Sequence, residues 1–177
     1  MSLFPAEPRT RQVAHYVISH VQPSQLGATK LNKVMWKADV LHYRRYGKSV
    51  TGQTAYVRMP QGPVPNHMKE AIEELKAEQV IVERRVETIK GARREFVPVH
   101  RMEASDFSAT EVEVLHEAID VVCKMSARAA SDDTHDALWE EIENGGQMPI
   151  RAAAVILGEL EPGDFQWALS QSAAAAG

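Results

Sequence analysis

Residues 30–65 read KLNKVMWKADVLHYRRYGKSVTGQTAYVRMPQGPVP, and this stretch decides the expected fold. Its first half carries apolar side chains at helical spacing, at Leu31, Val34, Met35, Ala38 and Leu41. We therefore expect a helix that Thr29 caps and Gly47 ends. The second half ends in Gly-Pro-Val-Pro, where the prolines exclude a helix or a central strand. This end predicts a stiff, extended connection.

The segments on either side predict more helices and one hairpin. Apolar spacing predicts a helix over residues 10–21, closed by Pro23, and a second helix that Asn66 caps and that runs through Gln79. Two strand-like arms then flank Lys90-Gly91-Ala92, which indicates a β-hairpin. A helix followed at once by a hairpin is typical of a winged-helix module.

The C-terminal third predicts further helices. One begins at Ser108 or Thr110 and buries Cys123 as a small apolar side chain. A short helix capped by residues 132–134 follows, and a third enters at 148–150 and ends near Leu160. A last amphipathic piece over 165–169 precedes an Ala-rich tail, 170–177, that has no reason to be ordered. The expected fold is a mainly α (α+β) compact single domain over residues 1–169, with a small β-hairpin.

Composition favours a globular cytoplasmic protein. The 177 residues are 44% hydrophobic and 25% charged, and no apolar run approaches the ~20 residues that span a bilayer. Pro5, Glu7 and Pro8 stand where a signal peptide would be apolar. The single cysteine excludes an intramolecular disulfide. We expect no membrane partner.

Charge is distributed unevenly along the chain. Residues 1–65 carry a net charge of +7, residues 66–100 are neutral, and residues 101–177 carry −11. Either the basic third docks on the acidic third within one fold, or at least one of them faces an oppositely charged partner.

The sequence offers no catalytic constellation. It contains no nucleophile elbow, phosphate loop or dinucleotide fingerprint, and its histidines are scattered. Asp39 and His42 share a helix face, but two ligands are fewer than a stable metal site needs. We expect a protein that is not an enzyme and that has no cofactor and no metal.

The helix within 30–46 offers a candidate binding face. A basic stripe comprises Lys30, Lys33, Lys37 and Arg44, beside an aromatic and polar face of Asn32, Trp36, Asp39 and Tyr43. Trp, Tyr and Arg often anchor protein interfaces, because they bury a large area and keep a polar group. The alternative is that the aromatic residues are half-buried core and the lysines a solvated face.

The hairpin supports a different function, in which the chain regulates its own operon as a winged-helix DNA-binding protein. Five basic residues would flank the wing tip and meet phosphates: Arg84, Arg85, Lys90, Arg93 and Arg94. The preceding helix opposes this function, since Glu70, Glu73, Glu74 and Glu78 would face the negative charge of DNA.

Taken together, these motifs closely resemble the Panacea domain, the SocA-type antitoxin family associated with phage and toxin–antitoxin loci. The first half of the family pattern falls on Lys30, Leu31, Lys33, Trp36, Ala38, Asp39, Gly47, Gly62, Pro63 and Val64. A weaker companion pattern falls on Thr134, His135, Trp139, Gly146 and Ile150. The resemblance covers roughly residues 11 to 155, and the family more often has tyrosine at the place of Trp36.

The resemblance implies an antitoxin that neutralises a cognate toxin protein by direct binding. Within the SocA branch it also implies an adaptor that delivers the toxin to the ClpXP protease. We expect the toxin to contact the helix face and the loop beside it, at Lys33, Trp36, Lys37, Tyr43, Arg44, Gln61, Gly62 and Pro63.

Overall fold

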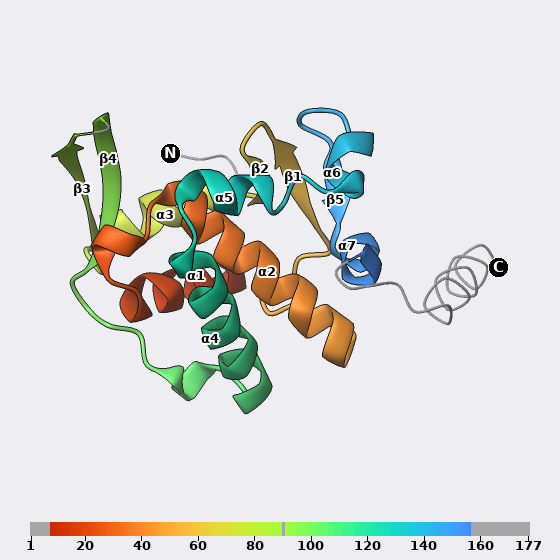
Figure 1. The fold of residues 1–177 in the computed structure, drawn as a ribbon. Helices are drawn as coiled ribbons and strands as arrows, with labels where there is room; N and C mark the ends of the chain where they lie inside the picture. The colour runs from red at the N-terminus through yellow and green to blue at the C-terminus, as the bar shows by residue number, and fades with distance from the viewer. Residues whose placement is uncertain (1–7, 90, 157–177) are drawn as a thin grey trace.

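The computed structural model describes residues 8–89 and 91–156 and has a mainly α (α+β) fold (Figure 1). Its helices are α1 (Pro8–His20), α2 (Ala28–Tyr46), α3 (Met68–Ala77), α4 (Ala109–Lys124), α5 (Ala127–Asp132), α6 (Ala137–Glu141) and α7 (Ile150–Ile156). Its strands are β1 (Ala55–Met59), β2 (Gly62–Pro65), β3 (Ile81–Thr88), β4 (Gly91–Pro98) and β5 (Gln147–Pro149). The predicted fold class is confirmed. The predictions for Lys90, for the helix end near Leu160 and for residues 165–177 lie outside the described residues.

Helix α2 is the central element, and Figure 1 shows it crossing the middle of the molecule. It packs against α1, α4, α5, α7 and β2. The apolar positions predicted from helical spacing are buried, apart from the half-buried Leu41, and they join the main hydrophobic cluster of the described residues. A helix that is covered on several sides must bury polar positions as well, and α2 buries Lys33, Asp39 and His42.

The predicted C-terminal end of α2 is confirmed, and its predicted N-cap is wrong. Gly47 ends the helix with φ 71°, and its N–H donates to the Tyr43 carbonyl, so this prediction is confirmed. The predicted cap Thr29 is wrong, because Gly27 is the N-cap residue and Thr29 lies inside the first turn. The Thr29 hydroxyl instead donates to Gln61 Oε1 at 3.1 Å.

Two other predicted caps are also wrong. His67 precedes α3 with φ 57°, while the Asn66 side chain binds Gln53 and the Ala55 carbonyl. The segment 132–134 caps no helix, because the chain forms α5 and α6 in place of the single predicted helix. Their caps are Ser126 and Asp136, each of which accepts a backbone N–H. Ser108 does cap α4, in a capping box with Glu111.

The Gly-Pro-Val-Pro segment is a strand, where the sequence predicted only an extended connection. It forms β2, the edge of a three-stranded antiparallel sheet with the order β2-β1-β5. Gly62 lies opposite Met59 and Pro65 opposite Tyr56, so a turn over residues 60–61 joins the strands. An edge position suits prolines, because they lack the N–H that a central strand would need.

The predicted hairpin is confirmed. Strands β3 and β4 pair from Ile81 opposite Pro98 to Thr88 opposite Gly91. Ile81 and Phe96 are buried at its base, and Figure 1 shows its tip projecting from the helical body.

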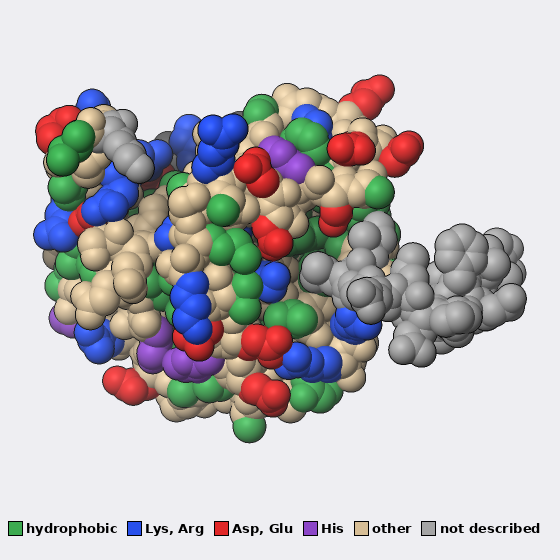
Figure 2. Space-filling model, viewed as in Figure 1, with side chains coloured by type: hydrophobic (Ala, Val, Ile, Leu, Met, Phe, Trp, Pro, Cys, Tyr) green, Lys and Arg blue, Asp and Glu red, His purple; other side chains and the backbone are tan. Residues whose placement is uncertain are grey.

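The basic and acidic thirds of the chain pair in part within the fold. Ion pairs join Arg9 to Glu111 at 2.8 Å, Lys37 to Asp133 at 3.5 Å, and Arg45 to Glu117 at 2.8 Å. On the face drawn in Figure 2, basic and acidic side chains are interspersed. Folding therefore compensates part of the charge gradient seen in the sequence.

Candidate functional site

Residues from distant parts of the chain converge on the turn between β1 and β2. We call this arrangement the clamped turn: residues 59–62, together with the side chains of Thr29, Lys33, Arg58, Ser131, Thr134, His135 and Trp139 that hold them. Lys33 and Thr134, which bond to each other here, are 101 positions apart in the sequence. The tip of the turn is exposed, and Met59 has a relative accessibility of 41%. A turn held from several elements presents its exposed side chains with little conformational freedom left to lose.

The α5–α6 segment holds one side of the turn. The Trp139 indole N–H donates to the Met59 carbonyl at 3.2 Å, and the Ser131 hydroxyl donates to the Gln61 carbonyl at 2.9 Å. The Arg58 guanidinium lies 3.6 Å from the centre of the Trp139 ring, a cation–π contact. The His135 ring stacks on the same indole, with the ring centres 3.8 Å apart. The second half of the motif therefore anchors the turn.

Helix α2 holds the other side through Lys33. Its ammonium donates to the Thr134 hydroxyl at 2.7 Å, and that hydroxyl donates to the Ser131 carbonyl at 2.9 Å. A Cβ at residue 62 would lie 1.6 Å from Lys33 Nζ and 2.5 Å from Thr134 Oγ1, and Gly62 has φ 107°. The space and the backbone conformation at residue 62 both require glycine. Lys33, Gly62 and Thr134 thus form one packed unit.

Burial shifts the protonation of this unit. Lys33 is only 2% exposed, and burial lowers its pKa to about 7, against which Asp133 acts. The pKa of His135 is also lowered, first by burial and then by the positive charge of Lys33. The clamped turn therefore holds a lysine whose charge changes near neutral pH.

A second polar unit on α2 fixes the chain that leads into β1. Asp39 is fully buried, and its Oδ1 accepts the backbone N–H groups of Val50 at 2.7 Å and Thr51 at 2.9 Å. Its Oδ2 accepts the hydroxyls of Thr51 and of Tyr56, the latter at 2.9 Å. Burial raises the pKa of this carboxyl to about 6, although the four hydrogen bonds oppose the shift. Asp39 positions β1, and through β1 the turn.

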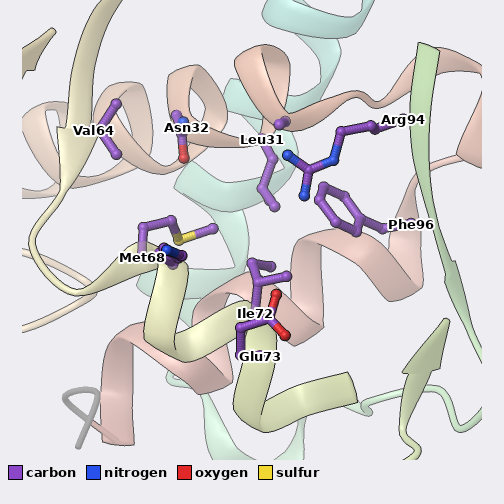
Figure 3. Close-up of a pocket in the computed structure, with 10 residues that line it drawn as sticks. Leu31, Asn32, Val64, Met68, Ile72, Glu73, Arg94 and Phe96 are labelled. Carbon is purple, nitrogen blue, oxygen red and sulfur yellow. The ribbon is translucent and has the colours of Figure 1, made fainter. Parts of the chain in front are cut away.

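One hollow adjoins the clamped turn, and a second lies next to the first. The turn hollow, of about 280 Å³, is lined by Thr29, Asn32, Lys33 and residues 59–64. The hairpin groove, of about 200 Å³, lies between α2, α3 and β4, and Figure 3 shows Leu31, Met68, Ile72 and Phe96 meeting in it. Asn32 and Val64 line both, so the two hollows form one continuous surface along the first half of α2.

The predicted binding face on α2 is divided by the fold. Trp36 is 4% exposed and packs its ring on Tyr56, with ring centres 5.1 Å apart, so it belongs to the core. The expected continuous basic stripe is wrong, because Lys33 is buried and Lys37 is paired with Asp133. Tyr43 is half-buried and Arg44 exposed near the far end of the helix. Lys33, Gln61, Gly62 and Pro63 are the predicted residues that lie in or beside the turn.

The arginines predicted to bind DNA are engaged within the hairpin. Arg84 and Arg93 both pair with Glu95, Arg94 pairs with Glu83, and Arg85 pairs with Glu87. These ion pairs neutralise much of the charge that phosphate binding would use.

The described ranges, 8–89 and 91–156, contain no group of three side chains that could hold a metal ion. His42 binds the Lys48 carbonyl and lies 3.2 Å from the Thr110 hydroxyl, while the Asp39 carboxylate accepts the four hydrogen bonds described above.

None of the helices in the described part of the chain is long and apolar enough to cross a membrane.

Sequence reasoning missed Arg58, Ser131, Thr51 and Tyr56. Ser131 lies three residues before Thr134 of the motif, and this position was the only indication of its importance. Its hydroxyl binds the Gln61 carbonyl, 70 positions away in the sequence, which the sequence alone does not show. Arg58 and Tyr56 were part of a strand-like segment whose pairing partners the sequence did not reveal.

Comparison with known families gives one match. The family model described as "Antitoxin SocA-like, Panacea domain" matches residues 31–140, which is more than half of the chain. The chain therefore belongs to this family, and membership indicates an antitoxin role and a non-catalytic regulatory protein. The searches of curated proteins and of solved structures found no match.

Proposed function

We propose that this member of the SocA-like Panacea family neutralises a cognate toxin protein by binding it directly, in the cytoplasm, through the clamped turn and the two hollows described above. One observation carries the proposal: the two halves of the family pattern meet at one exposed turn. The turn is held by side chains from two distant parts of the chain while its tip stays exposed, and such a preorganised surface loses little conformational freedom when a partner binds.

The shape and chemistry of the surface support a protein partner. The turn hollow exposes Met59, Pro60 and Gln61 at its rim, and the hairpin groove offers an apolar floor with Asn32, Glu73 and Arg94 around it. An apolar centre with a polar rim is the usual anatomy of a protein interface.

Substitution at the tip tests the proposal. Met59→Glu places a charge on an exposed side chain and leaves intact the Met59 carbonyl that Trp139 binds. We expect toxin affinity to fall about 10-fold or more, since hot-spot changes at an interface centre cost at least ~1.4 kcal/mol. Val82→Glu, at a 50% exposed apolar position on the hairpin, is the matched control and should change affinity less than about 2-fold. Equal effects of both variants would contradict the proposed surface.

We further propose the adaptor mode, in which the bound toxin is delivered to ClpXP. Toxin and antitoxin are expressed together in cells where ClpXP can be switched off, and growth and toxin level are followed. Rescue that needs the active protease, with loss of the toxin, supports delivery. Rescue that persists without the protease, with the toxin accumulating in a complex, supports blocking alone and would overturn delivery.

A further inference from the structure

Lys33 is a buried cation that has no matching anion among the described residues. An ammonium group has three N–H donors, and in this part of the chain Lys33 Nζ has one hydrogen-bond acceptor, Thr134 Oγ1. Within residues 8–89 and 91–156, no carboxylate oxygen lies within 4.0 Å of it, and the nearby Asp133 pairs with Lys37 at 3.5 Å. Buried charges in folded proteins are normally paired, because an isolated charge loses its hydration without compensation.

Lys33 lies at the edge of an open space. Lys33 lines the turn hollow, whose other walls include Met59, Pro60 and Pro63. Gly62 has no side chain, and this lets Nζ reach the backbone of the turn. A group that entered the hollow would therefore meet a positively charged donor set among largely apolar walls.

We propose that Lys33 is the receptor for a carboxylate of the toxin, a Glu or Asp side chain or the C-terminus, which enters the turn hollow and pairs with the ammonium. This inference rests on the proposed function and adds the chemical class of the group that is recognised. The pair would be desolvated on both sides, the setting in which charged pairs contribute most to specificity.

The hollow fits a carboxylate better than a phosphate. Proteins that bind phosphate usually present several donors from arginine side chains or a helix N-terminus. The turn hollow offers one ammonium, and the neighbouring Arg58 is held over the Trp139 ring. One positive charge at the edge of a hollow of about 280 Å³ matches a group with one negative charge.

Proton uptake gives this pairing a specific signature. In the free protein burial lowers the pKa of Lys33 to about 7, and the charged or titratable groups around it are Asp133, Asp136, Lys37 and His135. An arriving carboxylate favours the charged ammonium, so the pKa of Lys33 rises on binding. At pH 8 the complex should therefore take up protons that the free antitoxin lacks.

The test is calorimetric titration of the full-length antitoxin with purified cognate toxin at pH 8, in two buffers of different ionisation enthalpy. We expect proton uptake for the wild type. Lys33→Met keeps most of the side-chain volume and should bind about 30-fold more weakly or worse, the effect of leaving a buried charge unpaired across an interface. It should also lose the proton uptake, while its own melting temperature does not fall.

Lys30→Met is the matched control. It removes the same charge one turn earlier in α2, from a side chain that binds the Cys123 carbonyl on α4 and does not line the turn hollow. Its affinity should stay within about 3-fold of wild type.

The outcomes separate the two proposals. No binding by the wild type overturns the proposed function. Wild-type binding with unchanged affinity in Lys33→Met overturns the carboxylate and leaves the proposed function standing. If Lys33→Met fails to fold, NMR of the wild-type lysine side chains follows Lys33 directly. A pKa that rises in the complex supports the pairing, and one that falls or stays constant contradicts it.

Discussion

Helix α2 buries two opposite charges six positions apart, and their surroundings differ. The carboxylate of Asp39 accepts four hydrogen bonds from Val50, Thr51 and Tyr56. The ammonium of Lys33 has one acceptor in the part of the chain that the structure describes, the hydroxyl of Thr134. Both residues belong to the motif that carries the family resemblance, and the motif itself does not show how the two charges are paired.

The difference separates fold from function. A buried charge whose hydrogen-bonding capacity is filled stabilises the positions of its partners, and Asp39 fixes the chain that enters β1. A buried charge that is left partly unpaired destabilises the free protein. Its presence has a physical reason if a partner supplies the missing anion. Asp39 thus has the properties of a structural residue, and Lys33 those of a binding residue.

The largest expected effect on stability comes from substituting Asp39. Asp39→Asn keeps the size and the acceptor for the backbone N–H groups of Val50 and Thr51, but it removes the buried carboxylate charge and puts an NH2 group where Oδ2 accepts the hydroxyls of Thr51 and Tyr56. We expect the free energy of unfolding to fall by about 3 kcal/mol or more, measured by urea denaturation. Tyr56→Phe removes one of the four donors and should cost about 1 kcal/mol. A loss below that value for Asp39→Asn would show that the four bonds do not hold the fold.

Gly62→Ala tests the packing around Lys33. The added Cβ would overlap Lys33 Nζ, and the alanine backbone would have to adopt φ 107°. We therefore expect a loss of about 2 to 3 kcal/mol in the free energy of unfolding. Gly47→Ala is the matched variant, since Gly47 has φ 71° and no atom within 4 Å of the added Cβ. It should cost about 1 kcal/mol from backbone strain alone. Equal losses of unfolding free energy in the two variants would mean that the Lys33 side chain can move away from the added methyl group at no cost.

The pH dependence of stability should reveal the unpaired charge. The pKa of Lys33 is about 7 in the folded protein, against an ordinary value of 10.5. Between these values the unfolded chain binds the proton and the folded chain does not, so stability rises with pH. From pH 7 to 9 we expect a gain of up to about 2.5 kcal/mol, at 1.36 kcal/mol per pKa unit. The same denaturation series on Lys33→Met should lack this gain, and a slope that is equal in both proteins would refute the shift.

The smallest expected effect comes from the clamp itself. Trp139→Phe keeps a ring beside Arg58 and His135 but removes the N–H that binds the Met59 carbonyl. We expect a loss of about 1 kcal/mol in thermal unfolding. Lys33 should keep its lowered pKa in this variant, because burial lowers that pKa and Gly62 and Thr134 still cover the ammonium. A pKa that returns toward 10.5 would mean that the two halves of the clamp are coupled.

The sequence predicts the fold well where the signal is local. Helical spacing located α1, α2 and α4, the glycine at 47 ended α2, and two strand-like arms around residues 90–92 located the hairpin. These signals depend on neighbours in the chain, which the sequence contains in full. The predictions that Thr29 and Asn66 cap helices were wrong because both side chains bond elsewhere. Thr29 donates to Gln61, and Asn66 donates to the Ala55 carbonyl in β1.

The site was harder to predict because it is made by distant contacts. The spacing of Lys33 and Lys37 suggested a basic stripe that binds a partner, but in the fold Lys33 is buried and Lys37 is paired with Asp133. Trp36 was expected to be an anchor and is core, while the anchor of the turn is Trp139. The family motif contains Lys33, Gly62 and Thr134, but only the fold shows that these three residues are in contact.

The most direct test is hydrogen exchange of the antitoxin with and without its cognate toxin. Binding through the clamped turn predicts slower exchange over residues 59–64 and 131–139, with no change over 43–48 at the far end of α2. Protection confined to the hairpin, residues 81–98, would contradict this binding surface and return attention to β3 and β4.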